Sequence, residues 1–152
     1  MRSTGRGFSL PELALTLSII AILTAMAVAK VGTILSRSKV DRAASVVAAD
    51  LELAFTTGGR LRQPMRFKCD CANKTYALYD VLNGGALRFQ RIFGLNSAYP
   101  LDSMRFTPDS MTVLPPGRVY SATLPFQVDL FSGARVRRVT MSSAGFVRIT
   151  TP

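Results

Sequence analysis

Two cysteines, Cys69 and Cys71, are the residues whose type and spacing point most directly to chemistry. On an extended strand their Cα atoms would lie about 6.5 to 7 Å apart, at or beyond the limit for a disulfide. A bond between them therefore requires a turn at this point and an oxidising compartment. The alternative is a pair of small, half-buried side chains. A closed zinc site needs four ligands, so this pair alone does not predict a metal.

The rest of the composition argues against catalysis. The 152 residues include no His and no Trp. The lack of His removes the commonest general base and any Ser-His-Asp or Cys-His arrangement. A calcium site needs clustered acids, whereas the aspartates beyond the first third of the chain are scattered: Asp70, Asp80, Asp102, Asp109 and Asp129. We therefore expect a protein that is not an enzyme and holds no cofactor or metal.

Basic residues outnumber acidic ones and give a formal net charge of +10, which favours partners that carry phosphate. The densest basic cluster of the C-terminal part consists of Arg135, Arg137, Arg138 and Arg148. These arginines are candidates for contact with the phosphates of DNA. Neighbours on a strand point to opposite faces, however, so Arg137 and Arg138 cannot both join one surface patch. Subunit docking or plain solvation is the alternative role.

A single carboxylate, Glu12, stands at the head of an apolar run and is the only charge between Phe8 and Lys30. With its flanks, the run over residues 13–29 reaches the roughly 20 residues that a membrane helix needs. A lone carboxylate costs about 2.5 to 3.5 kcal/mol in such a helix and therefore needs a reason. The simplest reason is its favourable position near the positive end of the helix dipole.

The same N-terminal region also matches an ordinary secretory signal. Arg2 and Arg6 form a basic start, and residues 27–29 read Ala-Val-Ala, so cleavage after Ala29 would release a secreted soluble protein. Two observations weigh against this alternative. Glu12 would have no function at the start of the hydrophobic region of a signal peptide. The helical periodicity also continues past the cleavage point.

The N-terminus resembles the class III leader of type IV pilins and pseudopilins through the stretch Gly7-Phe8-Ser9-Leu10-Pro11-Glu12 and the apolar run after it. The resemblance implies that a prepilin peptidase removes leader residues 1–7 by cutting between Gly7 and Phe8, and then methylates the new amine of Phe8. It also implies that residues 8–31 form a transmembrane and assembly helix. In that role Glu12 would pair with the Phe8 ammonium of a neighbouring subunit.

Behind these residues, the hydrophobic periodicity predicts one long helix followed by strands. Apolar residues recur every three or four positions over residues 40–55, so residues 32–63 form the amphipathic half of a helix running from about Pro11 to at least Thr57. Gly58 and Gly59 supply a stop signal and Pro64 a firm limit. After Pro64 the period becomes two, and strands are expected at 65–68, 75–81, 87–92, 104–106, 111–114, 123–131, 136–141 and 146–150.

This order predicts an α+β, pilin-like fold, with the helix packed on an antiparallel β head over residues 64–152. The layout is similar to the GspH/FimT group of minor pilins and pseudopilins. That resemblance implies a single-pass protein of the bacterial inner membrane with a periplasmic head. It would assemble with other pilin or pseudopilin subunits into a type IV pilus or a type II secretion pseudopilus, near the tip. The alternative within this group is a DNA-binding minor pilin that acts in DNA uptake.

Overall fold

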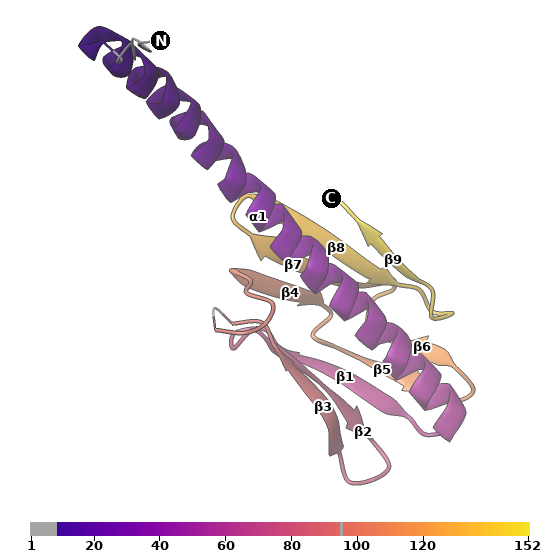
Figure 1. Ribbon diagram of the computed structural model, residues 1–152. Helices are drawn as coiled ribbons and strands as arrows, with labels where there is room; N and C mark the ends of the chain where they lie inside the picture. Colours follow the sequence, from indigo (N-terminus) through magenta and orange to yellow (C-terminus); the bar gives the residue numbers. More distant parts are fainter. Residues whose placement is uncertain (1–8, 95) are drawn as a thin grey trace, which may run out of the picture. The chain divides into compact units, whose positions relative to one another are not determined.

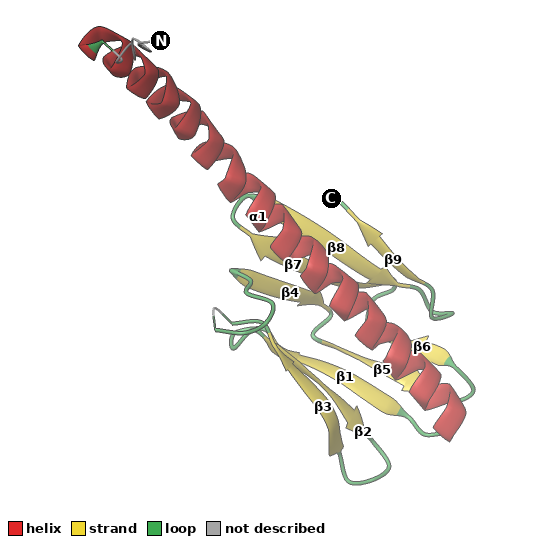
Figure 2. Cartoon of the chain, in the orientation of Figure 1, coloured by secondary structure: helices red, strands yellow, loops and turns green. Residues whose placement is uncertain are grey.

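The computed structural model describes residues 9–94 and 96–152, so Gly7 and Phe8 lie outside the described residues. It contains one long helix, α1 (Leu10–Leu61), and nine strands that form two antiparallel sheets (Figures 1 and 2). The expected α+β fold, with a long N-terminal helix and an antiparallel head, is confirmed. The chain divides into two compact units, one up to Leu35 and the other from Ser36 to Pro152, which we call the head.

The start of α1 follows from its first residues. The carbonyl of Ser9 accepts hydrogen bonds from the amides of Glu12 and Leu13, both at 3.1 Å, and Pro11 is tolerated in the first turn because that position needs no intrahelical donor. Further along, the polar side chains of the apolar run bond back to carbonyls one turn earlier, as Ser18 and Thr24 do at 2.8 and 2.7 Å. These hydroxyls are therefore compatible with an apolar surrounding.

The end of α1 lies at Leu61, inside the predicted interval, but the two glycines do not stop the helix. Gly58 and Gly59 are helical, and the turn comes later, at Arg62 with φ of 51°. Gly58 has a packing role instead. A Cβ placed there would come within 3.0 Å of Cγ1 of Val113, so the missing side chain lets α1 approach strand β5 (Ser110–Leu114) closely.

The nine strands form a five-stranded and a four-stranded sheet. In spatial order, the first contains β3 (Ala86–Ile92), β2 (Thr75–Asp80), β1 (Met65–Asp70), β5 and β6 (Arg118–Tyr120). The second contains β4 (Ser103–Thr107), β7 (Phe126–Ser132), β8 (Arg135–Met141) and β9 (Val147–Thr150). All eight expected strands are present within a few residues. The three-residue β6 was not expected, because so short a strand leaves no alternating pattern, and β7 begins later than expected.

The consecutive strands β4 and β5 do not pair with each other but belong to different sheets. Phe106 of β4 pairs with Val128 of β7, whereas Met111 of β5 pairs with Phe67 of β1. The short connection between these strands therefore carries the chain from one sheet to the other. Figure 1 shows the head part of α1 lying across strands of both sheets.

The core of the head lies between α1 and the sheets. The helix contributes mostly small side chains, including Ala43, Ala44 and Ala54, which are fully buried. The sheets contribute large aromatic ones, with Phe67 and Tyr76 at a centroid distance of 4.7 Å. Small helical residues against large strand residues allow close packing of a helix on a sheet. Burial of this interface is what holds the head part of α1 in place.

Candidate functional site

The apolar part of α1 is a candidate assembly site because its large side chains are exposed. The large hydrophobic residues between Leu10 and Leu35 are each at least half exposed. An 18-residue stretch of this helix has a mean hydropathy of 2.1 and is 0% buried. By length and composition, it could cross a membrane. Such a surface requires lipid or other protein to cover it.

Glu12 lies in the first turn of this apolar helix, with its side chain exposed. Among the described residues its carboxylate has no ion-pair partner in the chain. The predicted partner, the amine of Phe8 in another subunit, falls outside what the structure describes. The helix is continuous through residue 29, so cleavage after Ala29 would cut within a helix.

Within the head, Asp50 anchors α1 through a buried polar contact. Its Oδ2 accepts a hydrogen bond from the Tyr76 hydroxyl at 2.7 Å and another from Arg91 Nε at 2.8 Å, and its Oδ1 accepts from Arg91 Nη2 at 3.1 Å. Burial, together with the negative charge of Asp50, raises the pKa of Tyr76. The hydrogen bond to Asp50 raises the pKa of Arg91. The sequence analysis missed this contact, although Asp50 lies three residues after the buried Val47 and therefore on the same face of the helix.

Two of the four candidate DNA-binding arginines are engaged by carboxylates on opposite faces of β8. Arg137 donates through Nε to Asp41 of α1 at 2.5 Å, and this bond raises the pKa of Arg137. Arg138 donates through Nε and Nη2 to the two oxygens of Asp129 of β7, at 2.7 and 3.1 Å, and this raises the pKa of Arg138. Neighbouring strand positions thus face opposite sides, as strand geometry requires.

The other two arginines of that set, Arg135 and Arg148, are exposed and form no ion pair with another described residue. Arg135 lies at the start of β8, whereas Arg148 lies on β9 opposite Thr140. The four arginines therefore do not gather into one basic patch. Contact of these residues with DNA stays a prediction.

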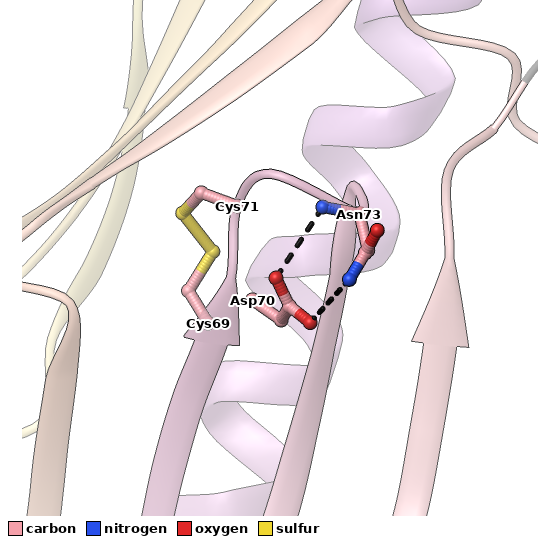
Figure 3. The surroundings of a disulfide bond; sticks show 4 residues. All are labelled: Cys69, Asp70, Cys71 and Asn73. Atoms are coloured by element: carbon pink, nitrogen blue, oxygen red, sulfur yellow. Dashed lines mark hydrogen bonds between the residues drawn. A yellow bond between two sulfur atoms is a disulfide. The ribbon is translucent and has the colours of Figure 1, made fainter.

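Cys69 and Cys71 are joined by a disulfide, with their Cα atoms 5.3 Å apart. The bond occurs where β1 ends at Asp70 and a turn begins, which brings the two Cα atoms closer than an extended strand would. Figure 3 shows Asp70 bound to the amide and side chain of Asn73 in the same turn. Among the residues that the structure describes, no group of three or more His, Cys, Asp or Glu side chains could hold a metal.

A similar fold is also found among solved structures. The minor pseudopilin EpsH from the type 2 secretion system of Vibrio cholerae is similar, with a TM-score of 0.59 and 17% sequence identity. The match covers 75% of this chain and 98% of the EpsH chain. The chain has a pseudopilin-like fold. At this identity the similarity concerns the fold. No family model matches the chain, and no curated protein matches it.

In this pseudopilin-like head, half of the carboxylates form ion pairs with arginines, and the basic residues outnumber the carboxylates. Asp80 is fully buried and accepts a hydrogen bond from Arg88 Nη2 at 2.7 Å and from the Asn83 side chain at 2.5 Å. Asp41, Asp50 and Asp129 also form ion pairs with arginines. Half of the eight acidic residues of Ser36–Pro152 are therefore engaged in ion pairs. The remaining exposed lysines and arginines therefore give the head surface its positive character.

Proposed function

We propose that the chain is a minor pilin or pseudopilin. The apolar part of α1 anchors it in the bacterial inner membrane in a single pass, and the head lies in the periplasm. The subunit assembles with other pilin or pseudopilin subunits into a type IV pilus or a type II secretion pseudopilus, near its tip. It performs no reaction. The observation that supports this best is the exposed apolar helix with one carboxylate at its start, continuous with a head of pseudopilin-like fold.

The proposal includes processing by prepilin peptidase. The enzyme removes residues 1–7 by cutting between Gly7 and Phe8 and methylates the Phe8 amine. The new ammonium group of one subunit then pairs with Glu12 of its neighbour. This pairing compensates a carboxylate that is costly in the bilayer, and it fixes the register between subunits.

Intact mass spectrometry of protein extracted from membranes tests the processing step. We expect a mass that lacks residues 1–7 and has gained one methyl group. A chain that begins at Lys30 would instead establish cleavage after Ala29 and a secreted protein, which contradicts the proposal.

The assembly step is tested by Glu12→Val, with Glu52→Val as the control because Glu52 is an exposed carboxylate of the head part of α1. Both variants should insert and be cleaved. Only Glu12→Val should fail to co-purify with sheared filaments or crosslinked pseudopili. Normal incorporation of the Glu12→Val subunit would show that the pairing does not occur.

The alternative function, binding of DNA during uptake, is less well supported by the geometry. Two of its four candidate residues, Arg137 and Arg138, are held by Asp41 and Asp129. Titration of the full chain with duplex and single-stranded DNA at several salt concentrations tests it. If these residues contact phosphates, the affinity for DNA should fall as the salt concentration rises. It should also be lower in Arg135→Ala and Arg148→Ala than in the wild type.

A further inference from the structure

The face of the five-stranded sheet that points away from α1 carries two adjoining hollows. On β1 the side chains alternate, so Met65 and Phe67 face the core while Arg66 and Lys68 face outward. The cross-strand partner of Arg66 is Tyr79 of β2. Hollows of about 540 Å³ and about 460 Å³ lie on this face, and both are lined by Lys68 and Tyr79. Together they are large enough for a small organic ligand.

The larger hollow has the chemistry of a site for hydroxyl groups. Small residues, among them Ala72 and Ala77, leave it open, and the turn closed by the disulfide forms one end. Asp70, Gln90 and Asp109 add two carboxylates and an amide to its lining. Carboxylates accept hydrogen bonds and an amide both donates and accepts, which suits the several hydroxyls of a sugar.

The smaller hollow has the chemistry of a site for an anion. Arg66 and Lys68 line it together with Tyr79, and none of its lining residues is acidic. Both basic side chains are exposed, and neither makes an ion pair within residues 9–94 and 96–152. An Arg beside a Lys can receive a carboxylate through charge-assisted hydrogen bonds. Tyr79, half-buried between the two hollows, offers its ring to an apolar ring face.

We propose that this face binds an acidic saccharide, such as a chain of uronic acids. The carboxylate lies at Arg66 and Lys68, one sugar ring lies over Tyr79, and the hydroxyls lie against Asp70, Gln90 and Asp109. A nucleic acid fits less well because stacking of successive bases needs several aromatic side chains, whereas Tyr79 is the one aromatic residue that lines these two hollows. An acidic protein segment fits less well because neither hollow has the large apolar lining that anchors a peptide side chain.

The test is isothermal titration of the full chain with trigalacturonate, in an amine-oxide detergent because many mild detergents carry sugar headgroups themselves. Parallel titrations use the neutral galactose trimer, oligothymidylate and pentaglutamate. We expect saturable binding of trigalacturonate, at least about tenfold weaker binding of the neutral trimer, and no saturable binding of the other two. Equal or tighter binding of oligothymidylate or pentaglutamate, or no binding of trigalacturonate, overturns the proposal.

Variants assign the binding to this face. Lys68→Ala should weaken trigalacturonate binding about tenfold, since it removes one charged hydrogen-bond donor. Tyr79→Leu should also weaken it, whereas Tyr79→Phe keeps the ring and should retain it. Arg105→Ala, which removes an exposed cation from β4 of the other sheet, is the matched control and should change nothing. Unchanged binding in Lys68→Ala and Tyr79→Leu overturns the assignment. The proposal does not depend on filament assembly, so the two can fail separately.

Discussion

The hydroxyl of Tyr76 donates a 2.7 Å hydrogen bond to Asp50 and so ties β2 to α1 inside the core. Both side chains are almost fully buried, at 1% and 4% exposure. Burial of a carboxylate is costly unless donors compensate it, and here Arg91 supplies the second donor group. A hydrogen bond is directional, whereas the apolar contacts around it are not. This contact therefore fixes where α1 lies along the sheet as well as how far α1 lies from the sheet.

We expect Tyr76→Phe to lower the free energy of unfolding of the head by about 1 to 3 kcal/mol, because the buried Asp50 then loses one of its donors. The ring and its packing remain, so the fold should be retained. Urea denaturation followed by circular dichroism measures the change. Tyr79→Phe is the control, since its hydroxyl makes no hydrogen bond with another described residue. Equal stability of both variants would contradict a stabilising role for the Tyr76 hydroxyl.

The ion pair between Arg137 and Asp41 makes a second prediction, for the contact between α1 and the four-stranded sheet. Arg137→Ala should lower the urea midpoint of the head, because Asp41 loses its closest cation. Arg135→Ala, two residues earlier on β8 and exposed, should leave the midpoint nearly unchanged. The double variant with Arg137→Ala and Asp41→Ala should lose less unfolding free energy than the sum of the losses in the two single variants. Additive effects would show that the pair contributes no coupling.

A third prediction concerns the packing of Phe55 against a glycine turn. Gly145 has φ of 85°, and a Cβ there would lie 2.4 Å from the Phe55 ring. Gly84 also has positive φ, at 64°, but nothing lies within 4 Å of its Cβ position. Gly84→Ala should therefore lower the free energy of unfolding by about 1 to 2 kcal/mol, which is the strain of a residue with a side chain in the left-handed backbone conformation. Gly145→Ala should cost about 1 to 3 kcal/mol more, from overpacking.

Thermal unfolding of the two glycine variants measures that difference. Gly145→Ala should be tolerated better in a Phe55→Ala background, where the ring is absent and only the backbone strain remains. A loss of stability that is the same for Gly84→Ala and Gly145→Ala would mean that Phe55 moves away without cost.

The sequence predicted the helix and all but one of the strands, but it did not predict how the strands pair. A period of 3.6 and then of 2 predicted α1 and eight of the nine strands, because burial of one face imposes those periods. The placement of the consecutive strands β4 and β5 in different sheets left no such pattern, since it depends on contacts between residues far apart in the chain. Gly58 was interpreted as a stop signal because its neighbour Val113 is 55 residues away in sequence and close only in the fold.

For the side chains, too, the sequence predicted local geometry but not contacts between distant elements. The sequence showed that Arg137 and Arg138 point to opposite faces, because this follows from strand geometry alone. It did not show that Asp41 and Asp129 engage them, since each partner lies on another element. Local signals therefore predicted orientation, and only the packed structure supplied the partners.

A fourth prediction follows from Asp80 at the end of β2. The hydrogen bond from Arg88, followed by those from Asn83 and the backbone amides of Asn83 and Leu82, lowers the pKa of Asp80 below its ordinary value of 3.8, against the opposing effect of burial. A carboxyl with a lowered pKa contributes stability that is complete above its unfolded-state value. This stability is lost as the pH falls through the lowered pKa.

The free energy of unfolding of the wild-type chain should therefore decrease as the pH is lowered below about 3.8, whereas Asp80→Asn should lack this part of the decrease. The gap between the two chains should be constant near neutral pH and should narrow in acid. Urea titrations of both chains across that range measure the gap. Asp70→Asn, which removes an exposed carboxylate at the end of β1, is the control for the loss of one negative charge. A gap that does not change with pH would mean that Asp80 acts through its shape and hydrogen bonds and not through its charge.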